Sequence, residues 1–161
     1  MKPRSAFTGL LLATAAHAAS AAPGVVVVVE RLYHDYAWEA VLSQPSDKLV
    51  GLMQAPPATL EKYFQPALAR LIVEDRECAA RTHEICRLDF DPIWGGQDPG
   101  ASDLTIAATS DPAIVRVRFT YPGDQHKIEL KFALTQTAAG WRIGNISAAD
   151  WDLLKILTRQ P

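Results

Sequence analysis

The sequence predicts an α+β domain, with N-terminal helices packed on one face of a curved antiparallel sheet of about four strands and a short C-terminal helix. Two patterns lead to this prediction. Apolar residues recur at helical spacing as far as about residue 80, and from residue 115 they alternate with polar residues, as in half-buried strands. Because the helices come first and the strands follow, the two halves are expected to form two packed layers.

Residues 1–22 precede this domain and have the features of a secretory signal peptide. Lys2 and Arg4 give a positive start, Ala6–Ala16 is an apolar run, and small residues follow. The alternative is a membrane anchor, but the uninterrupted apolar run is shorter than the ~20 residues that a spanning helix needs. We therefore expect cleavage, a single domain over residues 23–161 with no membrane span after cleavage, and a periplasmic or secreted location.

Charge restricts the partners of the exported part. Loss of Lys2 and Arg4 with the signal peptide leaves 14 basic residues against 18 acidic ones, so the formal net charge changes from −2 to −4. Nucleic-acid binding needs a clustered positive surface, and an acidic chain argues against it. The partner expected is an unknown periplasmic protein or a small apolar ligand.

The helices are predicted from apolar periodicity and from the residues that end or begin them. A first helix is expected over residues 26–44, with Ser43–Asp47 at its end. Thr59 is expected to cap a short second helix. Pro66 either breaks that pattern or opens a third helix at the first position, where its missing N–H costs little, and residues 67–80 continue as helix.

Four strands and a last helix are predicted in the second half. The strands are a weak one over residues 104–108, two strong ones over 115–121 and 127–134, and one that begins at Trp141–Ile143; the helix covers 151–157. Pro122–Gln125 separates the two strong strands as a hairpin loop. Placing Tyr121 opposite His126 keeps their faces in register and pairs Arg118 with Glu129.

The alternation divides the predicted sheet into two faces. The inward face is almost wholly apolar and is made of Val115, Val117, Phe119, Tyr121, Ile128, Leu130, Phe132, Leu134, Trp141 and Ile143. The outward face carries Arg116, Arg118, Lys127, Lys131 and Arg142. A solvated face is the simpler interpretation of these cations, and a recognition surface for an acidic partner is the alternative.

Cys78 and Cys86 are the only cysteines. In an oxidising compartment such a pair favours a disulfide. Eight residues of continuous helix would hold the two Cα atoms ~12 Å apart, whereas a disulfide needs ~4.4–6.8 Å. The bond therefore requires the chain to leave the helix around Arg81–His83, and two reduced cysteines on an unbroken helix are the alternative.

The segment between the two halves carries the most distinctive residues. Leu88–Pro92 reads L-D-F-D-P, Gln97–Asp98 follows, and Trp141–Ile143 reads W-R-I further on. In these motifs the chain resembles an exported bacterial family, domain of unknown function 3828, over most of residues 23–161. The resemblance implies a nuclear transport factor 2-like (cystatin-type) cone with an internal pocket, but it implies no reaction. Some members are lipoproteins, and this chain lacks the cysteine that would carry the lipid.

Three interpretations of the Asp89–Asp98 segment follow from its chemistry. Asp89, Asp91 and Asp98 offer hard oxygen ligands for Ca²⁺, but their spacing is not that of a known calcium loop, so no metal site is expected. Capping of turns by the aspartates explains the same residues without a metal. The third interpretation makes Trp94, Gln97 and Asp98 the rim of the cone. The candidate ligand- or partner-binding residues are therefore Asp89, Asp91, Trp94, Gln97 and Asp98.

Catalytic patterns are otherwise scarce. Of the inward residues only Tyr121 titrates, and no nucleophile-elbow, phosphate-loop or zinc-protease motif occurs in the sequence. No cofactor is expected. The leading hypothesis is an exported non-catalytic binding module, in one version an inhibitor or immunity-type protein. The alternative is a small-molecule enzyme that uses the Asp89–Asp98 loop at the mouth of the cone.

Overall fold

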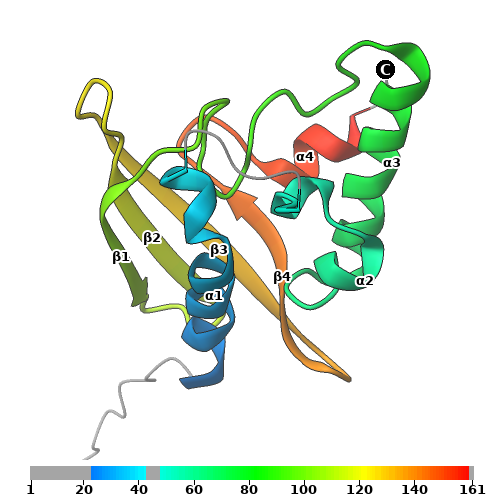
Figure 1. Cartoon of the computed structure of the whole chain (residues 1–161). Coiled ribbons are helices and arrows are strands. Elements are labelled where there is room, and N and C mark those ends of the chain that lie inside the picture. The colour runs from blue at the N-terminus through cyan, green and yellow to red at the C-terminus, as the bar shows by residue number, and fades with distance from the viewer. Residues whose placement is uncertain (1–22, 43–47, 160–161) are drawn as a thin grey trace, which may run out of the picture.

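The computed structural model describes residues 23–42 and 48–159, so the predicted signal peptide and the predicted helix end at Ser43–Asp47 lie outside the described residues. Helices come first, an open antiparallel sheet of four strands follows, and a short helix ends the described chain. The predicted α+β class is thus confirmed at this level. Figure 1 shows α1 lying across the sheet, while α2, α3 and α4 lie together beyond strand β4. Within the described ranges, no helix is both long and apolar enough to cross a membrane.

The first helix ends earlier than its periodicity predicts. Helix α1 (Pro23–Tyr36) passes into a single 3₁₀ turn, η1 (Ala37–Ala40), at Tyr36, where φ is −119°. The expected end at residue 44 was wrong by two turns. Tertiary contacts explain the early end of the helix, because the Glu39 side chain in η1 accepts a hydrogen bond from the backbone N–H of Leu52. Propensity alone does not report such a contact.

The next helices follow proline. After the 3₁₀ turn η2 (Leu52–Gln54), helix α2 (Pro57–Leu60) begins at a proline and has no side-chain cap. Thr59 lies inside α2, so its predicted capping role was wrong. Helix α3 (Pro66–Thr82) opens with Pro66 in its first turn, which is the second of the two alternatives given for this proline.

The predicted break after α3 allows the predicted disulfide. His83 follows Thr82 in the left-handed conformation, with φ at 59°, and turns the chain back. Cys78 and Cys86 are bonded, and their Cα atoms are 6.1 Å apart. This distance is about half of what an unbroken helix would give. The disulfide therefore pins the chain that leads from α3 to the Asp89–Asp98 segment.

The sheet is a meander in the order β1-β2-β3-β4. Its strands are β1 (Ser102–Ala108), β2 (Ile114–Thr120), β3 (Lys127–Thr137) and β4 (Gly140–Ser147). The hairpin between β2 and β3 has the predicted register: Tyr121 N–H donates to the His126 carbonyl at 2.9 Å, and Arg118 faces Glu129. Their side chains form an ion pair at 2.6 Å.

Two irregularities in the sheet were not predicted. The register of β4 against β3 shifts between Ala133 and Leu134, which leaves Gly144 as an extra residue in β4. A Cβ on Gly144 would lie 2.8 Å from the Thr135 hydroxyl oxygen, so any larger residue at this bulge would require Thr135 to shift. The shift changes which side chains face inward, and it buries Ile146 completely. The other irregularity lies in β1 next to Asp103, whose φ is 55°.

The face of the sheet that α1 covers is filled by apolar side chains. Of the ten residues predicted to face inward, seven are buried: Val115, Val117, Phe119, Leu130, Phe132, Leu134 and Ile143. The other three, Tyr121, Ile128 and Trp141, are half-buried. Helix α1 supplies the opposing layer with Val25, Val29, Leu32 and Tyr33. On the outward face Arg118, Lys127 and Lys131 are exposed, and Arg116 and Arg142 are half-buried.

Candidate functional site

The Asp91–Gly96 loop is closed by its own backbone. Asp91 N–H donates to the Gly96 carbonyl at 2.9 Å, and Gly95 N–H donates to the Asp91 carbonyl at 2.8 Å. Gly95 has φ at 67°, which is unfavourable for a residue with a side chain. The Asp91 carboxylate accepts a further bond from Ile93 N–H at 2.9 Å. Turn capping is thus confirmed for Asp91.

A buried polar network joins this loop to the first helices. Trp94 Nε1 donates to Glu39 Oε2 at 2.9 Å, and Leu52 N–H donates to Glu39 Oε1 at 2.7 Å. The Tyr33 hydroxyl donates to the Ile93 carbonyl at 2.6 Å. The Trp94 ring meets the Tyr33 ring edge to face, with centroids 5.2 Å apart. These contacts hold the loop against the core.

Burial changes the acidity of the groups in this network. It raises the pKa of Asp91 to about 7, helped by the negative charge of Glu39 and opposed by the bonds from Ile93 and Trp94 N–H. Burial also raises the pKa of Glu39, while the bonds from Trp94 and Leu52 lower it. The pKa of Tyr33 is raised by burial and by the charge of Asp91. The raised pKa of Asp91 is therefore a consequence of the burial of its carboxyl group in this loop.

The candidate residues do not converge on one point. Trp94 is 2% exposed and belongs to the core, whereas Asp89, Gln97 and Asp98 are exposed. Throughout the described ranges, the side chains of Asp89 and Asp98 form no hydrogen bond or ion pair with the protein. Across residues 23–42 and 48–159 no three His, Cys, Asp or Glu side chains lie close enough together to hold a metal ion. Of the five candidates, only Asp91 and Trp94 take part in this network, and Glu39, which accepts the bond from Trp94, was not indicated by the sequence.

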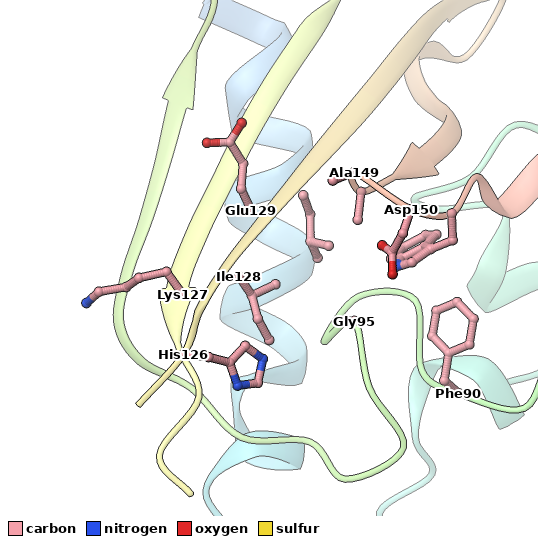
Figure 2. Close-up of a pocket in the computed structure, with 11 residues that line it drawn as sticks. Phe90, Gly95, His126, Lys127, Ile128, Glu129, Ala149 and Asp150 are labelled. Atoms are coloured by element: carbon pink, nitrogen blue, oxygen red, sulfur yellow. The ribbon is translucent and has the colours of Figure 1, made fainter. Parts of the chain in front are cut away.

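An open groove of about 420 Å³ lies beside this loop, and sequence reasoning missed it. It is lined by Phe90, Gly95, His126, Lys127, Ile128, Glu129, Leu130, Ala148, Ala149, Asp150 and Trp151. Figure 2 shows His126 and Ile128 on the side of β3 that faces Gly95, while Lys127 and Glu129 point the other way. The rings of Phe90 and Trp151 line the opposite wall of the groove and pack edge to face, with their centroids 4.9 Å apart.

The groove exists because β4 ends before β3 does. Pairing between the two strands stops at Lys131 and Ser147, although β3 begins four residues earlier, at Lys127. The chain then turns back, and Ala148 N–H donates to the Trp151 carbonyl at 3.0 Å. The first residues of β3 therefore have β2 on one side and the groove on the other.

Comparisons of the chain with protein-family models, with curated proteins and with solved structures found no match.

Proposed function

We propose that this protein is an exported, non-catalytic binding module, and that it holds its partner in the groove between β3 and the Phe90–Trp151 wall. One observation carries the proposal: the face of the sheet that α1 covers is packed with buried side chains, whereas the groove is open and lined by both apolar and charged side chains. A filled interior offers no room for substrate. An open groove with aromatic groups and a mixed polar rim is the kind of surface that partners bind.

Export and family membership are parts of the same proposal. The disulfide suits an oxidising compartment, which agrees with the signal-peptide features of residues 1–22. Four antiparallel strands with α1 on one face suit the nuclear transport factor 2-like cone of the exported family described above. In this protein the interior of the cone would be core, and binding would take place outside it. An inhibitor or immunity-type protein is one version of such a module.

The ionisable groups around the groove support binding over catalysis. His126 is bonded to Asp124, and Glu129 is bonded to Arg118 at 2.6 Å. His126 and Glu129 are thus each paired with a neighbour on the surface, where solvent screens the electrostatic interaction of the pair. General acid–base catalysis needs a titratable group with a tuned pKa next to bound substrate. The charged side chains on this rim fit recognition better.

A small-molecule enzyme is the second candidate, because Asp91 has a raised pKa beside a second carboxylate, Glu39. Paired carboxylates with separated pKa values are a frequent acid–base arrangement. However, both carboxylates accept backbone bonds, and neither lines the groove. Asp91→Asn separates the two candidates. It should leave partner binding unchanged if the protein is a binding module, and it should abolish turnover if the protein is an enzyme.

Two matched alanine variants test the proposal. Ala149 is exposed and lines the groove, whereas Ala139 is exposed in the turn between β3 and β4, far from it. Ala149→Arg should fill the groove at little cost in stability, and Ala139→Arg places the same side chain elsewhere. Each tagged protein is incubated with periplasmic extract, and bound proteins are identified by mass spectrometry. A partner that binds wild type and Ala139→Arg but not Ala149→Arg supports the proposal. Equal binding to all three contradicts it.

A further inference from the structure

The groove exposes backbone groups of β3 that carry no strand partner. Antiparallel residues alternate between bonding to one neighbouring strand and bonding to the other. Because Tyr121 N–H bonds to the His126 carbonyl, the even-numbered residues of β3 bond to β2. The odd-numbered residues, Lys127 and Glu129, therefore direct their N–H and C=O groups to the opposite side.

On that opposite side there is no protein strand within the described chain. Pairing with β4 stops at Lys131, and the chain turns away at Ala148–Trp151. None of the other backbone or side-chain hydrogen bonds found among the described residues involves the backbone of Lys127 or Glu129. Such a row of donors and acceptors is a template for one more strand.

We propose, building on the function proposed above, that the groove binds an extended segment of a partner protein, which joins the sheet antiparallel to β3 and bonds to the backbone of Lys127 and Glu129. The added strand would take the path that β4 leaves vacant after Ser147. Strand addition of this kind obtains affinity from backbone bonds and specificity from pockets for alternate side chains.

The side chains beside the groove define the segment that fits. Alternate residues of an added strand face inward, toward Ile128 and Leu130 and the rings of Phe90 and Trp151, so they should be apolar. The other residues face outward beside Lys127 and Lys131. Glu129, which lies between these two lysines, is already paired with Arg118. Asp150 adds a negative charge elsewhere in the lining, but beside the outward positions of β3 the Lys127 and Lys131 ammonium groups favour aspartate or glutamate in the added strand.

The partner is therefore a polypeptide segment with alternating apolar and acidic residues. A small apolar ligand would use the aromatic wall but would leave the backbone groups of β3 without partners. A globular surface without an extended segment would meet the same backbone groups poorly. These two occupants are outcomes that the experiment distinguishes.

Proline removes a backbone donor and thereby tests the strand directly. Glu129→Pro deletes the N–H that faces the groove and removes no bond to β2, while Glu129→Ala deletes only the side chain and serves as the matched control. A display library of random peptides of about twelve residues is selected on the folded, disulfide-bonded protein. The dissociation constant of the best peptide is then measured by titration against wild type and each variant.

We expect the selected peptides to alternate apolar and acidic residues, and Glu129→Pro to weaken their binding at least about tenfold relative to Glu129→Ala. If Glu129→Pro unfolds, the comparison passes to Lys127→Pro and Lys127→Ala, because proline is tolerated at the first residue of a strand. Circular dichroism and the melting temperature of each variant establish its folding.

Equal binding by the proline and alanine variants overturns the added strand, and so does a selection that yields no binding peptide. If Ala149→Arg abolishes capture of a native partner and Glu129→Pro does not affect it, the groove remains the binding site and only the strand is refuted. If neither substitution affects capture, both proposals fail.

Discussion

Phe132→Ala is the substitution that separates a filled interior from an open pocket. Phe132 lies in the middle of β3, is fully buried, and meets the Tyr33 ring edge to face with centroids 5.9 Å apart. Truncation of a buried phenylalanine costs ~3–5 kcal/mol through lost burial and the cavity that remains. Most domains have only ~5–15 kcal/mol of stability in total, so the decrease in the free energy of unfolding should be readily measurable.

The assay is urea unfolding followed by tryptophan fluorescence, with Lys131→Ala as the control. Lys131 immediately precedes Phe132 in β3, but its side chain is exposed on the outward face, so its truncation should change the free energy of unfolding by less than ~0.5 kcal/mol. Phe119→Ala and Leu130→Ala should behave as Phe132→Ala does. A neutral Phe132→Ala would show that its ring lines an open cavity, and the enzyme hypothesis would gain support.

Three further predictions follow from the loop and the disulfide. Burial raises the pKa of Asp91 from 3.8 to about 7, so the folded state binds this proton more tightly than the unfolded state, and its contribution to stability is lost as pH rises from about 4 to about 7. Asp91→Asn should therefore gain stability relative to wild type between pH 5 and pH 8 in urea titrations, and a constant difference would refute the assignment. Free-thiol titration of the denatured, unreduced protein should find no thiol, and Cys78→Ser with Cys86→Ser should lower the free energy of unfolding by ~2–3 kcal/mol; two titratable thiols would contradict the bond. Calcium should leave the melting temperature unchanged, whereas a rise that Asp91→Asn abolishes would restore a metal site.

Local sequence patterns were sufficient to predict those features that residues close together in the sequence determine. The β2–β3 hairpin was predicted with its register, because strict alternation on both sides of Pro122–Gln125 leaves one pairing that keeps the apolar faces together. The helix start at Pro66 was one of two predicted alternatives, and the break at His83 was predicted as the condition for the disulfide, since proline and a short disulfide each restrict the backbone directly.

Contacts between distant segments account for what could not be predicted. The first helix ends early where Glu39 accepts hydrogen bonds from Leu52 and Trp94, and no sequence pattern near Glu39 predicts these two bonds. The bulge at Gly144 depends on a close approach to Thr135 on the neighbouring strand.

The candidate site was predicted only in part for the same reason. Of the three interpretations of the Asp89–Asp98 segment, turn capping holds for Asp91, but the side chains of the segment divide between core and solvent. The groove beside it depends on where β4 leaves β3, at Ser147, and on a wall that brings Phe90 to Trp151. Alternation in the sequence reports which residues face inward, and it does not report how far a neighbouring strand extends.

Amide hydrogen exchange by NMR is the most direct test of the free edge of β3, because it observes the backbone groups on which the binding proposal rests. In the free protein, the amides of Lys127 and Glu129 should exchange fast, while those of Ile128 and Leu130, which bond to β2, should be protected. On addition of the captured partner or the selected peptide, the amides of Lys127 and Glu129 should become protected. Protection of these two amides in the free protein would refute the free edge, and no change in their exchange on binding would refute the added strand.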